Sequence, residues 1–279
     1  MAAPGREVNL PTLARHLVEN GPHKTLPTPR RVRILINGAC IADTLNTGGA
    51  LFVWEHPYYP QLYVPKSALL ENVKGYTIVY ENHRDVKDTH DKPIAQTLKV
   101  KVTRNSDNSM KEVKDGFMVF RDDLPERASP LNNMLKVNFS CADKWLEEDT
   151  PMFVHPKDPF KRIDILHCSR PLRVSLNNTV IANSPFSLQL HETGLRVRYY
   201  VPLSSVDTSV LRPSQTTTQC PYKGTAEYYD VVVGGETYKD VVWFYTQPTV
   251  ECAAIAGLCC FYNEKVDMQI QNGDEWHKA

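Results

Sequence analysis

Residues 31–44 read RVRILINGACIADT, and residues 171–184 read PLRVSLNNTVIANS in the same register. Further along, Glu55 before Tyr63-Val64-Pro65 matches Glu192 before Tyr200-Val201-Pro202. A repeat of this length is too long for a solenoid unit, so we interpret it as two copies of one domain. We predict an N-terminal helix and Pro-rich arm over residues 1–30, a first repeat over residues 31–166 and a second repeat over residues 167–279.

Each copy begins with the pattern of a short β-hairpin. Val32–Ile36 leads into Asn37-Gly38, the strongest local signal for a two-residue hairpin turn. The matching Asn177-Asn178 suits the same left-handed turn geometry. Short strand patterns follow at a spacing of roughly ten residues, and long amphipathic helices are missing from the pattern. We therefore predict an all-β fold of two related small antiparallel domains, tent-like or barrel-like, in tandem with a few short helices.

A few segments depart from the strand pattern. Asn9–Gly21 resembles a short helix with Asn9 as its N-terminal cap and Gly21 just past its end. Residues 22–29 are Pro-rich and are interpreted as a linker or arm. Residues 142–148 and 263–266 are predicted to be short helices, and the polar residues 104–115 an exposed hairpin loop.

Composition excludes several classes of function. The 279 residues are 42% hydrophobic and 23% charged, and 32 Lys and Arg balance 32 Asp and Glu, so no net field favours nucleic acid. No apolar run approaches the roughly 18 residues of a membrane span, and the N-terminus lacks a signal-peptide pattern. Seven cysteines without a regular framework favour reduced thiols in the cytoplasm. No cysteine spacing is typical of zinc, so we expect no metal.

The second copy alone carries Cys220-Pro221-Tyr222-Lys223-Gly224. Pro221 stiffens this loop, and Gly224 permits a backbone angle that other residues resist. An ammonium group near a thiol makes it a better nucleophile, so Lys223 and Cys220 could act together. Alternatively, Lys223 could lose its proton in an aromatic pocket and act as a base or bind a carbonyl. A third interpretation is structural, with Cys220 in the core and Lys223 paired with a carboxylate.

Glu55 and Glu192 stand at matching positions, which favours a shared structural task such as pairing with Arg33 and Arg173 or with Lys223. A partly buried glutamate is also a natural general acid or base. The second copy is rich in aromatic residues that could either line a pocket for a flat molecule or form β-core. Alternation places Trp243 and Tyr245 on one strand face and Phe244 on the other.

The chain resembles the family catalogued as domain of unknown function 427, which carries a nucleotidyltransferase label in some catalogues. In the second copy the resemblance rests on residues 220–226 (CPYKGTA), 255–258 (IAGL) and 261–267 (FYNEKVD). In the first copy it rests on Asn37-Gly38, residues 41–44, Trp54-Glu55 and residues 63–65, and residues 145–149 with 153–159 resemble the tandem form. The resemblance implies a compact, mostly antiparallel β-fold and no settled reaction. The sequence has neither a phosphate-cradling glycine loop nor acidic residues spaced for magnesium.

The leading functional prediction is a cofactor-independent enzyme that acts on a small organic molecule by acid–base chemistry such as isomerisation, cyclisation or elimination. Its predicted catalytic residues are Glu192, Lys223 and Cys220, and its substrate-binding residues are Tyr222, Trp243, Tyr245, Tyr228, Trp54 and Glu55. The alternatives are a ligand-binding or scaffolding protein without turnover and, third, a nucleotidyltransferase. We expect the two copies to contact each other, with homo-oligomers left open.

Overall fold

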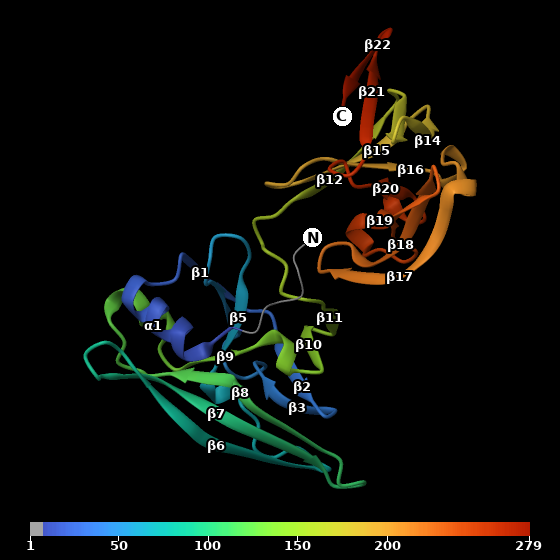
Figure 1. Cartoon of the computed structure of the whole chain (residues 1–279). Coiled ribbons are helices and arrows are strands. Elements are labelled where there is room, and N and C mark those ends of the chain that lie inside the picture. Colours follow the sequence, from blue (N-terminus) through green and yellow to red (C-terminus); the bar gives the residue numbers. More distant parts are fainter. Residues whose placement is uncertain (1–7) are drawn as a thin grey trace. The chain divides into compact units, whose positions relative to one another are not determined.

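The computed structural model describes residues 8–279, and contacts within it divide the chain into two compact units with a boundary between Asp158 and Pro159. Figure 1 draws the elements of both units. Both consist of antiparallel sheets joined by turns and short 3₁₀ segments. The prediction of an all-β tandem of two related domains is confirmed.

The first unit contains one helix, α1 (Leu10–Asn20), among its described residues. Its strands are β1 (Lys24–Thr28), β2 (Val32–Ile36), β3 (Ala39–Asp43), β4 (Ala50–Trp54), β5 (Gln61–Pro65), β6 (Tyr76–Lys87), β7 (Pro93–Arg104), β8 (Met110–Phe120), β9 (Met134–Val137), β10 (Lys144–Glu147) and β11 (Thr150–Met152). Its 3₁₀ segments are η1 (Lys66–Ala68), η2 (Glu126–Leu131) and η3 (Phe139–Cys141).

The second unit repeats this arrangement without a counterpart of α1 among its residues. Its strands are β12 (Ile163–Cys168), β13 (Leu172–Leu176), β14 (Thr179–Ser184), β15 (Ser187–Glu192), β16 (Arg198–Val201), β17 (Leu211–Cys220), β18 (Gly224–Val233), β19 (Glu236–Phe244), β20 (Cys259–Phe261), β21 (Asp267–Asn272) and β22 (Glu275–Lys278). Its 3₁₀ segments are η4 (Leu203–Ser205), η5 (Thr208–Val210) and η6 (Val250–Ile255).

The strand orders of the two units correspond one to one. The larger sheets run β1-β4-β5-β9-β8-β7-β6 and β12-β15-β16-β20-β19-β18-β17, and the smaller ones run β11-β10-β2-β3 and β22-β21-β13-β14. All four orders are open, so the sheets form no closed barrel over residues 8–279. This shared topology gives each position of one copy a structural counterpart in the other.

The predicted hairpin turns are confirmed in both units. Asn37 and Gly38 have φ values of 51° and 82°, and Asn177 and Asn178 have 46° and 61°. Both residues of such a turn lie in the left-handed region, which Asn and Gly tolerate best. β2 and β3 consequently pair directly across the turn, as do β13 and β14.

The cores lie on both faces of the larger sheets. In the first unit, one cluster fills the space between the two sheets, including Ile34, Phe52 and Trp145. A second cluster lies under α1, which packs on β6, β7 and β8 (Figure 1) through the face that carries Leu13 and Leu17. As predicted, Asn9 caps this helix, since its side chain accepts a hydrogen bond from the Thr12 amide.

Several local predictions were wrong because long-range pairing overrides local pattern. The Pro-rich residues 22–29 contain an edge strand, β1. A proline is tolerated there because it has no N–H to donate, and one side of an edge strand has no neighbouring strand to pair with. Residues 142–148 do not form a helix. They contain the strand β10, which pairs with β2. Residues 263–266 form a turn, and the hairpin loop within residues 104–115 is short, because β8 begins at Met110.

No helix within residues 8–279 combines the length and the apolar character that crossing a membrane would require.

Candidate functional site

The Cys-Pro-Tyr-Lys-Gly loop of the second unit is the tight turn between β17 and β18. Cys220 pairs with Gly224 across the hairpin, and Gly224 has a φ of 98°. A Cβ atom on Gly224 would lie 3.2 Å from the Gln247 carbonyl oxygen, so both the angle and the space favour glycine. The Thr249 side chain donates to the Tyr222 carbonyl at 2.5 Å, and the Thr249 amide donates to the Lys223 carbonyl at 3.1 Å. The loop is therefore held against the start of η6.

This turn directs Lys223 onto Glu192 at the end of β15. Lys223 Nζ lies 2.5 Å from Glu192 Oε2, and the two side chains are 11% and 8% exposed. The Cys220 Sγ atom lies 3.9 Å from the same Nζ. Of the two alternatives that the sequence left open for Glu192, pairing with Lys223 is the one observed. A carboxylate, an ammonium group and a thiol thus meet at one largely buried point.

The protonation of Lys223 follows from its neighbours. Burial acts to lower the pKa of Lys223, but its electrostatic interactions with Cys220 and Glu192 and the hydrogen bond to Glu192 outweigh it, so this pKa lies above its ordinary value. Lys223 therefore keeps its proton near neutral pH. This direction disfavours the interpretation of Lys223 as a free amine base, and it favours a role as a hydrogen-bond donor that stabilises negative charge.

Cys252 was not singled out from the sequence, and it lies in the same neighbourhood. It belongs to η6, which directly follows the Thr249 that holds the lysine loop, and it is fully buried. Burial raises the pKa of the Cys252 thiol, while the nearby Lys223 charge acts in the opposite direction. Cys252 is thus a neutral, enclosed side chain, whereas Cys220 is half-buried.

The aromatic residues of the second unit pack as a core layer beside this point. Trp243 and Tyr245 lie on the same face of the sheet in one cluster with Tyr228, and Phe244 lies on the other face against Tyr229, as alternation predicted. The Tyr228, Trp243 and Tyr245 side chains are nearly fully buried, and Tyr222 is 9% exposed. Trp243 donates to the Tyr200 hydroxyl at 3.3 Å. The layer is closely packed, and its members are held by one another.

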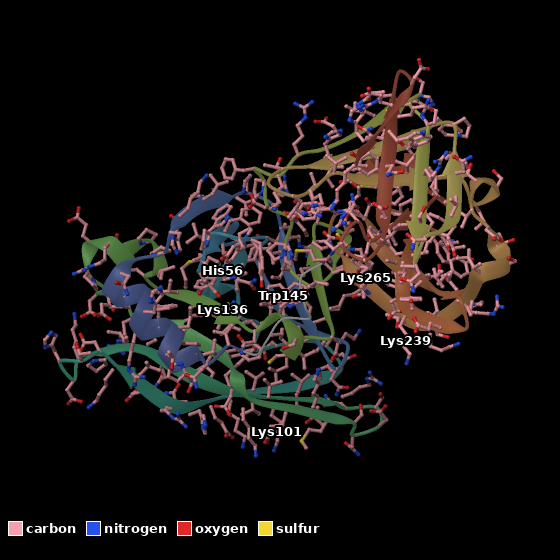
Figure 2. All side chains as sticks on the ribbon, turned by 45° about the horizontal axis from the view of Figure 1, so that its top comes forward. His56, Lys101, Lys136, Trp145, Lys239 and Lys265 are labelled. Carbon is pink, nitrogen blue, oxygen red and sulfur yellow. The ribbon has the colours of Figure 1, made fainter. Side chains whose placement is uncertain are left out.

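The first unit builds a matching ion pair from a different lysine. Glu55 Oε1 lies 2.7 Å from Lys136 Nζ and accepts a hydrogen bond from the Tyr63 hydroxyl at 2.9 Å. Lys136 is 1% exposed, and His56 lies beside it (Figure 2). Lys136 was missed from the sequence because it is a single cation between Leu135 and Val137 in a four-residue strand. The only sign of its role is its burial beside the repeated glutamate, and burial is visible in the structure and not in the sequence.

Register relates the two pairs. Tyr63 pairs with Lys136 across β5 and β9, and Tyr200 pairs with Cys260 across β16 and β20. Cys260 therefore occupies the position of Lys136, and the second unit supplies its lysine from the β17–β18 turn instead. The predicted partners Arg33 and Arg173 were wrong. Arg33 bonds to Asp149, and Arg173 stacks on Trp276 at 4.2 Å.

Trp54 is not joined to the Glu55 pair. Trp54 and Glu55 are consecutive, so they point to opposite faces of the sheet. Trp54 lies in the core between the two sheets of the first unit, and its indole donates to Asp158 at 3.3 Å. The predicted site residues thus divide into Glu192, Lys223 and Cys220 at one point, an aromatic layer beside them, and Trp54 and Glu55 in the other unit.

Within residues 8–279, no three His, Cys, Asp or Glu side chains gather closely enough to hold a metal ion. The model of the family described as "Domain of unknown function (DUF427)" matches residues 24–147 and again residues 164–272. The two matched segments cover most of the chain, and each falls within one unit. No curated protein matches the sequence.

Proposed function

Since the chain belongs to the family described as Domain of unknown function (DUF427), whose description assigns no reaction, we propose its function from the residues of the second unit. We propose a cofactor-independent enzyme that acts on a small organic molecule in the cytoplasm by acid–base chemistry, as in an isomerisation, cyclisation or elimination. The observation that carries this proposal is the Lys223 ammonium group between the Glu192 carboxylate and the Cys220 thiol.

Each residue has a defined role in the proposal. Glu192 accepts a proton from the substrate, and Lys223 stabilises the negative charge that develops and returns a proton to it. Cys220 is auxiliary and borders the ammonium group. Tyr222, Trp243, Tyr245 and Tyr228 surround the substrate, with Tyr222 nearest to the lysine along the chain.

Comparison of the two units supports this assignment. Glu55 is neutralised by a lysine inside a strand, which is sufficient for packing. The second unit has Cys260 in place of that lysine. Its cation is Lys223 of a turn, which lies next to the Cys220 thiol. A buried ion pair contributes little net stability on average, so stability alone does not explain this change.

The test compares metabolite turnover by wild type with turnover by Lys223→Met and Glu192→Gln. Each protein is incubated with a low-molecular-mass cell extract, and consumed and formed compounds are followed by mass spectrometry. We expect a conversion by wild type that both variants lose by about 100-fold or more. The matched controls are Lys136→Met and Glu55→Gln, which alter the equivalent pair of the first unit. Equal turnover by all five proteins contradicts the proposal, as does equal loss in both pairs among variants that remain folded.

A binding or scaffolding protein without turnover is the second candidate, and the near-complete burial of the Glu192–Lys223 pair favours it. In that case Lys223→Met and Glu192→Gln change stability and leave ligand or partner affinity intact without any turnover to lose. The third candidate, nucleotide transfer, is suggested only by the short name of the family model. It requires magnesium-dependent binding of ATP or GTP, and a calorimetric titration without heat excludes it.

A further inference from the structure

A cavity of about 290 Å³ lies in the first unit, at the start of α1. The helix packs on β6, β7 and β8 (Figure 1). It is lined by the consecutive residues Val8–Pro11 and by four polar side chains, those of Arg84, Thr97, Asp115 and Asn138. A volume of this size is at the small end of ligand sites, which span roughly 300–1,000 Å³. The ligand that fits it is correspondingly small.

The helix itself does not provide the polar character of this cavity. Asn9 already accepts a hydrogen bond from the Thr12 amide, its carbonyl accepts one from the Leu13 amide, and Pro11 has no N–H. The polar groups are side chains instead. At the base, Thr97 is 2% exposed and Asn138 is 5% exposed, and the Asn138 amide donates to the Val8 carbonyl at 3.3 Å.

Opposite charges lie at the opening. The Arg84 guanidinium group has no hydrogen-bond or ion-pair partner within residues 8–279. Asp115 is 79% exposed on its side chain, and its neighbour is His83 at 3.8 Å, beyond hydrogen-bond distance. A guanidinium group can pair with a planar carboxylate, and a carboxylate can pair with a cation such as an ammonium group. Both charges thus retain bonding capacity toward a third molecule.

Comparison with the second unit indicates that the space is a specific feature of the first. Thr97 pairs with Met118, and Tyr228 pairs with Trp243 at the equivalent position of the other sheet. Asn138 directly follows β9, as Tyr262 directly follows the equivalent β20. The second unit therefore has two tyrosines where the first has a threonine and an asparagine. The smaller side chains of the first unit leave space for the cavity, and α1, which the second unit lacks, covers it.

We propose that this cavity binds a small zwitterion of the α-amino acid class. The carboxylate of the ligand pairs with Arg84, its ammonium group pairs with Asp115, and Asn138 and Thr97 lie at the inner end against its remaining atoms. The inference is independent of the proposed reaction, because none of these residues belongs to the Glu192–Lys223 site.

The test is a titration of the full chain, labelled with ¹⁵N, with L-alanine, L-leucine and L-glutamate, followed through the Thr97 amide and the Asn138 side-chain amide signals. Propionate and L-alaninamide are the matched probes, since each lacks one charge of alanine. We expect saturable shifts with at least one amino acid. Removal of either charge from the ligand should weaken binding at least about tenfold, because a hydrogen bond to a charged group is lost.

Arg84→Gln and Asp115→Asn are the variants of first choice, since both side chains lie at the surface and their replacement leaves the core intact. Each should weaken the amino acid about tenfold or more. Thr97→Tyr installs the residue of the second unit and should abolish binding by filling the space. The absence of saturable shifts with all three amino acids overturns the proposal. So does binding of alaninamide or propionate as tightly as alanine, or unchanged affinity in both charge variants.

Discussion

At the scale of single residues, the two units solve one packing problem with different atoms. A glutamate lies at or just past the end of an equivalent strand in both, and each needs a buried cation, since an unpaired buried charge costs several kcal/mol. The first unit provides Lys136 from within the sheet, and the second provides Lys223 from a turn. The same comparison identifies Gln189 and Ser187, which replace the core residues Phe52 and Ala50 of the first unit.

Gln189→Met is expected to raise the free energy of unfolding by about 1–2 kcal/mol. The Gln189 side chain is 8% exposed, and its Nε2 atom has no partner, so an apolar residue of similar length removes an unpaired donor. Urea unfolding of the variant and the wild type measures the difference. The control is Gln271→Met at a half-buried position, where the side-chain donor is not among the buried unpaired atoms, and it should change stability by less than about 0.5 kcal/mol. A Gln189→Met variant less stable than wild type would show that Gln189 has a partner.

At the scale of elements, turns place the residues that the strands cannot. Strand pairing brings Glu192 to the end of β15, but only the β17–β18 turn brings Lys223 to it. The turn requires Gly224 in the left-handed region and is tied to η6 through Thr249. Positioning of the ammonium group thus depends on a short segment of about five residues, which is the segment that distinguishes the second copy.

Gly224→Ala is expected to lower the free energy of unfolding by about 1–3 kcal/mol, because a Cβ atom is disfavoured at a φ of 98° and lies 3.2 Å from a carbonyl oxygen. Thermal unfolding measures this loss. The matched control is Gly235→Ala in the β18–β19 turn, where φ is 81° and no atom lies within 4 Å of the added Cβ. Only the conformational cost applies there, so the smaller effect belongs to Gly235. Equal effects at both positions would contradict the steric part of the argument.

At the scale of the whole molecule, the chain consists of two units that each have their own pair of sheets and their own core clusters. Two buried clusters belong to the first unit and two to the second. The clusters of the first unit include helix α1, whereas η6 lies over the corresponding layer of the second. Because each unit has its own core clusters, we expect a destabilising substitution in one unit to lower the stability of that unit alone.

Lys136→Met is therefore expected to lower one thermal transition and leave a second transition unchanged. Loss of one partner from a buried ion pair costs about 3–5 kcal/mol, and this cost falls on the first unit alone. Differential scanning calorimetry of the full chain resolves the transitions. Lys223→Met is the reciprocal variant and should lower the other transition. A single transition that shifts equally in both variants would show that the units unfold together.

Much of the fold was predictable because it rests on local signals repeated twice. Asn37-Gly38 and Asn177-Asn178 determine hairpin turns through backbone angles that few residues adopt, and Asn9 and Gly21 delimit α1 through satisfied helix ends. The all-β class and the duplication followed from the sequence, and the Glu192–Lys223 pair was one of two alternatives that it left open. β1 and β10 did not, since their strand state depends on partners about 30 and 110 residues away in the chain.

The amino-acid sequence by itself determined that the chain carries one β domain twice and that residues 220–224 distinguish the second copy. Only the tertiary structure decided what surrounds the two glutamates. It identified Lys136 as the partner of Glu55 and Cys260 as the counterpart of Lys136 in the second unit. It also identified Thr97 and Asn138 as the base of a cavity. The physical reason is that pairing register and burial arise from contacts between distant segments, which local sequence does not specify.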